Sequence, residues 1–161
     1  MLSYLNNTII QFPELAESLN AYAVEASWKL GKWDTLEQVL HKPCQNTFEV
    51  SLGKLLLSMH KDDWTEFGSH LETTRISLMA PLAAASKESY RRSYEYITKL
   101  HILHELETTL RLSDSGPTEL HAEHLNQLSQ SWDARLEMTA PSFQVREPIL
   151  NLRRAALDHL R

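Results

Sequence analysis

Apolar residues recur at helical spacing through almost the whole of this 161-residue chain. In one clear example, the steps between successive residues are 4, 3, 4 and 4, across Leu15, Leu19, Tyr22, Ala26 and Leu30. This spacing places side chains along one face of an α-helix, whereas a half-buried strand would show a period of two. The chain has only four glycines and six prolines, which disfavours a fold rich in β-turns. The sequence therefore predicts an all-α protein without a sheet.

Turn signals divide the helical pattern into segments. Pro13 is a favoured first helical residue, and Gly31 stands where a left-handed C-cap would end a helix. In the long third segment we expect Ile97 to face inward. Further breaks are expected at Pro43, Met79–Pro81, Ser113–Pro117 and Ala140–Pro141. The helical repeats are predicted at about 13–41, 46–79, 87–112 and 119–161, with a loop at 113–118.

Two tryptophans suggest that these segments repeat. Trp33 and Trp64 lie 31 residues apart, and each opens a predicted helix just after a glycine or polar turn. Tetratricopeptide repeats have a similar period of about 34 residues. The run from Gly31 to Asp34 resembles the Gly-x-aromatic-Asp turn of that repeat. We therefore expect antiparallel helix-turn-helix units in a tetratricopeptide-like α-solenoid. Trp28 and Trp33 should fill the space between antiparallel helices.

Composition excludes several classes of function. The net charge of −5 disfavours direct contact with nucleic acid, which a basic surface usually binds. The single cysteine, Cys44, rules out an internal disulfide and a cysteine-based zinc site. No apolar run approaches the roughly 18 residues of a membrane span, so we predict no membrane insertion.

The histidines are the main candidates for chemistry. His101 and His104 are three residues apart, as are His121 and His124, and such a pair could supply two zinc ligands. A metal-dependent enzyme using His101 and His104 is therefore one hypothesis. A third ligand at a defined spacing is missing, and there is no H-E-x-x-H motif. We favour histidines at a helix margin, and expect no catalytic residue, metal or cofactor in this chain.

Six blocks of the sequence stand in an order that is typical of a known family. They are Leu19–Leu30, Leu52–Ser58, Pro81–Ser86, Tyr90–Glu107, Trp132–Thr139 and Glu147–Leu157. Together they resemble the FAT domain of the phosphatidylinositol-3-kinase-related protein kinases, and in particular its ATR-like group of replication-stress checkpoint kinases. The segment from Leu112 to Ser131 matches this pattern poorly.

The resemblance implies a tetratricopeptide-like solenoid that clamps the kinase domain of the same parent chain. That kinase domain is absent here, so no catalytic residue can be carried over. The resemblance also implies an ATRIP-like partner, homodimerisation and a nuclear location. Arg153 and Arg154 are expected at a solvated or interface edge. The structural or interface candidates are Trp28, Gly31, Trp33, Trp64, Trp132, Arg135, Glu147, Pro148, Arg153 and Arg154.

Two hypotheses of different classes remain open beside the metal-dependent enzyme. The first is a non-catalytic scaffold segment of an ATR-like checkpoint kinase, which braces the kinase domain and supports assembly. The second is a free-standing tetratricopeptide-type adaptor that binds a partner peptide in its concave groove. A kinase domain encoded downstream would support the first hypothesis, and a stop codon after Arg161 the second.

Overall fold

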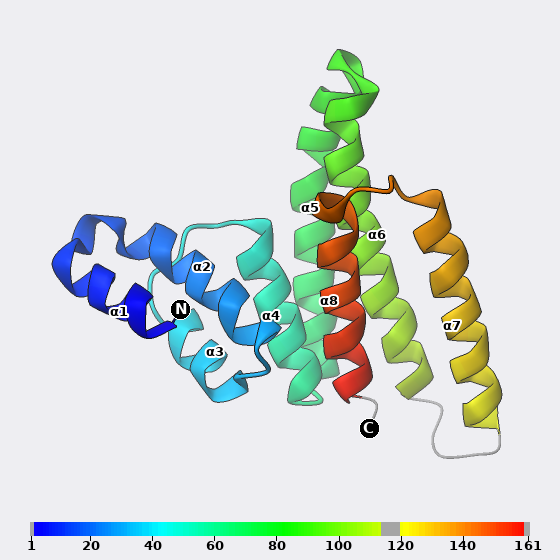
Figure 1. The fold of residues 1–161 in the computed structure, drawn as a ribbon, viewed down its shortest axis with the longest axis horizontal. Helices are drawn as coiled ribbons and strands as arrows, with labels where there is room; N and C mark the ends of the chain where they lie inside the picture. Colours follow the sequence, from blue (N-terminus) through cyan, green and yellow to red (C-terminus); the bar gives the residue numbers. More distant parts are fainter. Residues whose placement is uncertain (1, 114–119, 160–161) are drawn as a thin grey trace. The chain divides into compact units, whose positions relative to one another are not determined.

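The computed structural model describes residues 2–113 and 120–159, and these residues form eight α-helices, one short 3-10 helix and no strand (Figure 1). The prediction of an all-α chain is thus confirmed. Two compact units divide the chain at Ile76/Ser77, within helix α5. The helices are α1 Leu2–Gln11, η1 Pro13–Leu15, α2 Ala16–Lys29, α3 Trp33–Leu40, α4 Phe48–His60, α5 Trp64–Glu88, α6 Tyr90–Ser113, α7 Leu120–Met138 and α8 Phe143–His159.

In the first unit, α2 and α4 cross closely because the residues at the crossing are small. A Cβ added to Gly53 of α4 would lie 2.4 Å from Cγ1 of Val24 in α2, which is closer than atoms can approach. Val24 is itself fully buried. The crossing therefore needs a glycine at this position for reasons of space, because the backbone of Gly53 is ordinary helix.

The buried face of α2 differs from the predicted one. Leu15, Tyr22 and Leu30 were expected to face inward, but all three are exposed. The buried face instead carries mostly small side chains, namely Asn20, Ala21, Ala23, Val24, Ala26 and Ser27, together with Trp28. Small residues allow the close crossing with α4, so packing distance outweighs the burial that the larger side chains would have gained.

Two turns in the first unit have the same geometry 31 residues apart. Gly31 and Asp62 both adopt a left-handed backbone, with φ of 66° and 57°. The next amide donates to the oxygen of a buried serine in each case, Lys32 to Ser27 at 2.9 Å and Asp63 to Ser58 at 3.0 Å. Trp33 and Trp64 then open α3 and α5. The two turns share a backbone, but the assignment of all the predicted repeat boundaries stays a prediction.

The tryptophans at these turns are less buried than we expected. Trp28 is buried, but Trp33 is only half-buried and its ring stacks on that of His60, with centroids 4.6 Å apart. Trp64 is exposed, while Phe67 one turn later is buried. The first residue of a helix projects over the turn rather than into the core, which accounts for the difference.

In the second unit, α6 packs against both α7 and α8. Its buried residues Ile102, Leu103 and Leu106 meet a core from the other two helices. The hydroxyl of Tyr94 accepts a hydrogen bond from the amide of Ala140 at 2.8 Å, which ties α6 to the connection after α7. Buried residues of α7 and α8 include Leu128, Trp132, Ile149, Leu152, Ala155 and Ala156.

Two expectations in this region are wrong. α5 does not break at Met79–Pro81 but continues through Pro81 to Glu88. The following Leu82–Ala85 run consists of strong helix formers, which offsets the loss of one backbone donor. The break lies at Ser89, whose hydroxyl caps α6 by accepting from the amide of Arg92 at 3.3 Å. Ile97 is exposed rather than inward. The predicted loop at 113–118 lies, apart from Ser113, outside the described residues.

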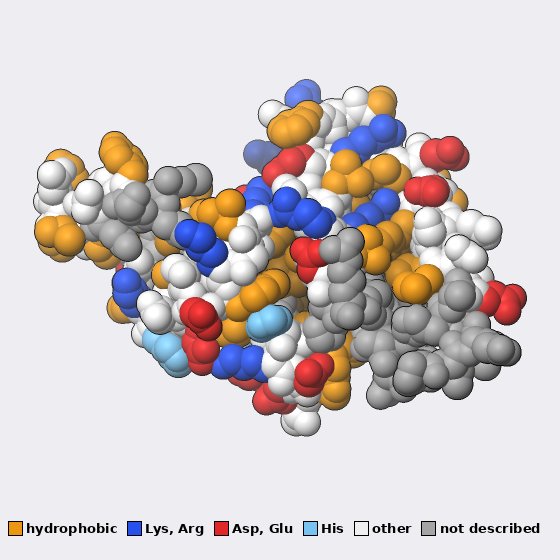
Figure 2. Space-filling view, turned by 60° about the horizontal axis from the view of Figure 1, so that its bottom comes forward, with side chains coloured by type: hydrophobic (Ala, Val, Ile, Leu, Met, Phe, Trp, Pro, Cys, Tyr) orange, Lys and Arg blue, Asp and Glu red, His pale blue; other side chains and the backbone are white. Residues whose placement is uncertain are grey.

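The surface carries mixed charges. On the face drawn in Figure 2, acidic and basic side chains are interspersed with hydrophobic ones. Within the described ranges, no helix is both long enough and apolar enough to span a bilayer.

The α2–α4 crossing gives a prediction about glycine. Gly53→Ala should destabilise the chain by about 1–3 kcal/mol, because the new methyl group meets the stiff side chain of Val24. Gly68→Ala is the matched control, because nothing lies within 4 Å of a Cβ at that helical position. That control should be neutral or stabilising by up to about 1 kcal/mol. Urea unfolding followed by circular dichroism measures both, and equal effects would contradict the close crossing.

Candidate functional site

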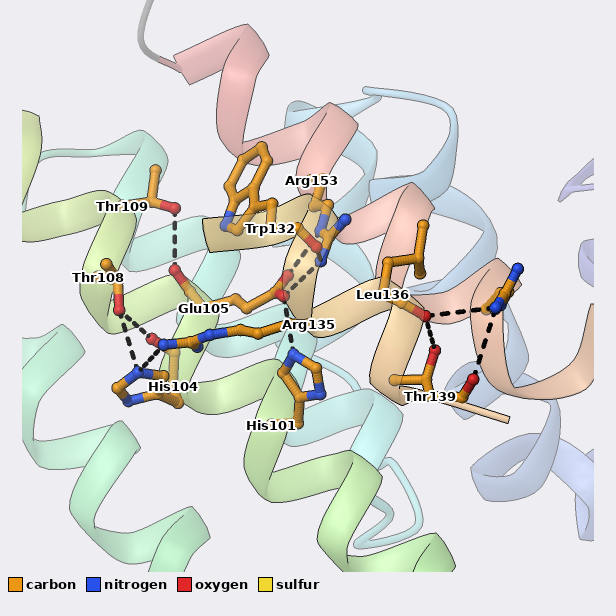
Figure 3. Close-up of polar contacts among 11 residues, drawn as sticks. His101, His104, Glu105, Thr108, Thr109, Trp132, Arg135, Leu136, Thr139 and Arg153 are labelled. Atoms are coloured by element: carbon orange, nitrogen blue, oxygen red, sulfur yellow. Dashed lines mark hydrogen bonds and ion pairs between the residues drawn. The ribbon is translucent and has the colours of Figure 1, made fainter. Parts of the chain in front are cut away.

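Four polar or aromatic side chains form a buried polar cluster between α6, α7 and α8 (Figure 3). The cluster consists of His101 and Glu105 from α6, Trp132 from α7 and Arg153 from α8. Glu105 is 1% exposed and Arg153 is 6% exposed. Charged residues are almost never buried so deeply unless they are paired, so the partners of these two groups define the site.

The centre of the cluster is a two-pronged ion pair. Nε of Arg153 donates to Oε2 of Glu105 at 2.8 Å, and Nη2 donates to Oε1 at 2.6 Å. Nη2 also donates to the backbone oxygen of Trp132 at 2.8 Å. The guanidinium carbon lies 5.1 Å from the centroid of the Trp132 ring, within the range of a cation–π contact. One arginine therefore binds both of the other helices at once.

His101 supplies a further donor to the same carboxylate. Its Nε2 lies 2.8 Å from Oε1 of Glu105, one helical turn away on α6. The oxygens of Glu105 lack protons when the group is ionised, so the histidine nitrogen is the donor. Thr109 donates to the backbone oxygen of Glu105 at 2.9 Å and holds the same turn of helix.

These contacts set the ionisation of Glu105. Burial alone would raise the pKa of this carboxyl, because a low dielectric disfavours the charged form. Hydrogen bonds from Arg153 and His101, with the positive charge of Arg153, outweigh burial and hold the pKa of Glu105 below its ordinary value. Glu105 is therefore a carboxylate at neutral pH, and both of its oxygens already accept hydrogen bonds.

The helical period places the pair inward. Glu105 stands between the buried residues Leu103 and Leu106, and Arg153 follows Leu152 on the buried face of α8. The expectation that Arg153 lies at a solvated or interface edge is therefore wrong, although its neighbour Arg154 is exposed. Opposite charges on two inward-facing helical positions were the signal that could have predicted the pair.

A second set of contacts lies beside the cluster. Arg135 places Nη2 2.8 Å from Nε2 of His104, and because arginine has only donors, that histidine nitrogen is the acceptor. Arg146 donates to the backbone oxygens of Leu136 at 3.3 Å and Thr139 at 3.5 Å. Carbonyls at the end of a helix have no partner within it, so Arg146 satisfies the C-terminal turn of α7.

The structure separates the sequence candidates into two groups. Trp132, Arg135 and Arg153 converge on α6, while Glu147 and Pro148 are half-buried on α8. The candidates Trp28, Gly31, Trp33 and Trp64 belong to the other unit or to its part of α5. Sequence reasoning missed Glu105 as the centre of the site.

The histidine pair does not form a common site. His101 contacts Glu105, whereas His104 contacts Arg135. Across residues 2–113 and 120–159, no group of three or more His, Cys, Asp or Glu side chains is arranged to hold a metal ion. The side chains of His121 and His124 lie outside the described part. What the cluster does physically is fix the spacing of three helices.

Comparison with known proteins gives a consistent result. The FAT domain family model matches residues 20–160. The chain is 31% identical over 177 residues to the serine/threonine-protein kinase ATR of Oryza sativa subsp. indica, covering 99% of this chain and 6% of that protein. Identity is 29% over 174 residues to ATR of Arabidopsis thaliana, covering 96% and 6%. It is 27% over 161 residues to ATM of Arabidopsis thaliana, covering 84% and 4%. This chain thus spans about 6% of the length of the ATR relatives.

The buried ion pair gives a prediction about stability. Arg153→Met should cost about 3–5 kcal/mol, because it leaves the charge of Glu105 buried without its main partner. The double variant E105M/R153M should recover most of that loss, because no unpaired charge remains. The exposed neighbour offers a matched control, Arg154→Met, with an effect within about 0.5 kcal/mol. Denaturant unfolding measures all three, and equal losses for R153M and R154M would contradict the pairing.

The lowered pKa of Glu105 gives a prediction about pH. The unfolded chain takes up this proton near the ordinary glutamate pKa of about 4.3, above the folded-state pKa. The stability that ionised Glu105 contributes is therefore complete above that pH and is lost as pH falls through the folded pKa. Glu105→Gln mimics the protonated state, so its stability deficit should shrink as the solution is acidified. A deficit that stays constant from neutral pH into acid would contradict the assignment.

Proposed function

Because this chain belongs to the FAT domain family, we propose that it is a scaffold segment of an ATR-like checkpoint kinase, where it braces the kinase domain of its parent chain. The FAT domain is a non-catalytic region of such serine/threonine kinases. The proposal includes signalling of DNA damage and replication stress in the nucleus, an ATRIP-like partner and homodimerisation. The family match over residues 20–160, with similarity to ATR over nearly the whole chain, is the observation that carries it.

The buried polar cluster supports a bracing role on physical grounds. Arg153 contacts α6 and α7 through directional hydrogen bonds as well as through packing. Moving α8 relative to either helix would leave a buried charge without a partner, at a cost of several kcal/mol. The three helices are therefore held in one arrangement, which is the property that a segment bracing another domain requires.

The groove between α2 and the start of α4 does not favour the peptide adaptor. Tetratricopeptide-type adaptors that catch acidic termini present basic or amide side chains in their groove. Here the lining carries Glu25 and Glu49, and Lys29 is directed to Glu25 at 2.8 Å. The groove is thus acidic, which is the wrong sign for such a peptide.

Binding to the kinase domain tests the proposal. We expect the 161-residue chain to bind the separately expressed kinase domain of its parent in biolayer interferometry. R153M should weaken that binding by about tenfold or more, because the helix arrangement loosens, while E105M/R153M should bind more tightly than R153M. Absence of binding by the wild-type chain, or phosphate transfer from ATP by the chain alone, would refute the scaffold role.

A further inference from the structure

The outer side of α8 carries three exposed apolar side chains in one line. Phe143, Leu150 and Leu157 are 82%, 48% and 41% exposed. They are seven residues apart, so each lies only about 20° around the helix from the one before. The other side of the same helix faces the core of its unit through Ile149, Leu152, Arg153 and Ala156. We call this line the α8 stripe.

Two opposite charges flank the α8 stripe on the same side. Glu147 follows Phe143 by four residues, and Arg154 follows Leu150 by four residues. They therefore occupy equivalent positions around the helix, seven residues apart. Asn151 donates to the carboxylate of Glu147, and Arg154 is exposed. The stripe is thus an apolar line with a negative charge before its centre and a positive charge after it.

We propose that the α8 stripe is the surface through which two copies of this chain pair, with their α8 helices antiparallel and Leu150 on the two-fold axis. That axis places Phe143 against Leu157 of the second copy, seven residues from the centre on either side. It also places Glu147 against Arg154 of the second copy, and the reverse pair forms by symmetry. This location for homodimerisation rests on the proposed function, which includes it.

The arrangement of charge favours a second copy over another kind of partner. A two-fold interface must be complementary to itself, because each residue meets its symmetry-related surface. The α8 stripe meets that condition with a leucine at the centre and opposite charges on one flank. A uniformly basic or acidic partner helix would bring a like charge against Arg154 or Glu147. One helix pair buries less than the roughly 800 Å² per partner of a standard interface, so the dimer should be weak and concentration-dependent.

Charge exchange tests the pairing in solution. Sedimentation velocity of the 161-residue chain should show dimer increasing with concentration. Glu147→Arg or Arg154→Glu alone should weaken dimerisation about tenfold or more, because each sets like charges together twice. The double variant E147R/R154E should restore it. Ile97→Asp alters an exposed apolar residue on α6 and is the matched control, which should dimerise like the wild type. A chain that is monomeric at every concentration would overturn the proposal.

Cross-linking tests the position of the axis. In a Cys44→Ser background, Leu150→Cys should form a covalent dimer with a short bifunctional maleimide, because the two copies of that residue face each other. Phe143→Cys alone should not, since its two copies lie about 21 Å apart along the helices. Mixing Phe143→Cys with Leu157→Cys should restore the cross-link. Equal cross-linking of Phe143→Cys and Leu150→Cys would overturn the antiparallel arrangement.

One further variant separates this inference from the scaffold role. Leu150→Asp should abolish dimerisation while its circular dichroism and its binding to the kinase domain stay unchanged. Dimerisation without kinase-domain binding would refute the bracing role and leave the α8 stripe supported. Kinase-domain binding by a chain that never dimerises would refute the α8 stripe alone.

Discussion

The second unit depends on the ion pair between Glu105 and Arg153. Burying two charges costs several kcal/mol each, and their attraction offsets that cost only when the geometry is good and the remaining polar atoms are satisfied. Here two hydrogen bonds join the pair, His101 supplies a third donor, and the oxygen of Trp132 takes up a further guanidinium proton. An apolar core of the same volume could be as stable, but it would tolerate sliding between helices that these directional contacts do not.

The first unit achieves close packing by a different route. Gly53 lets α4 approach Val24 of α2, and two left-handed turns reverse the chain at equivalent points of a 31-residue period. Its stability rests on fit between small side chains, whereas that of the second unit rests partly on polar contacts. The two units of one helical chain are therefore sensitive to different substitutions, to added volume in the first and to lost charge in the second.

Much of the fold follows from the sequence because helical spacing is a local property. The all-α class and the turn at Gly31 followed from spacing and from one residue that tolerates a left-handed backbone. The buried face of α2 did not follow, because small side chains give a weak hydrophobic signal although they permit the closest packing. The pairing of Glu105 with Arg153 joins residues 48 positions apart, and a single helix period cannot reveal which distant partner satisfies a buried charge.

The chemistry of the site agrees with a non-catalytic region. A general base or metal ligand needs a lone pair that is directed toward substrate or ion, and both oxygens of Glu105 already accept from Arg153 and His101. The same saturation lowers the pKa of this carboxyl and keeps it charged, so the cluster holds its shape at neutral pH. A group that is fully used in holding three helices together has nothing left to offer a reaction, and that is what a bracing segment of a larger kinase would require of it.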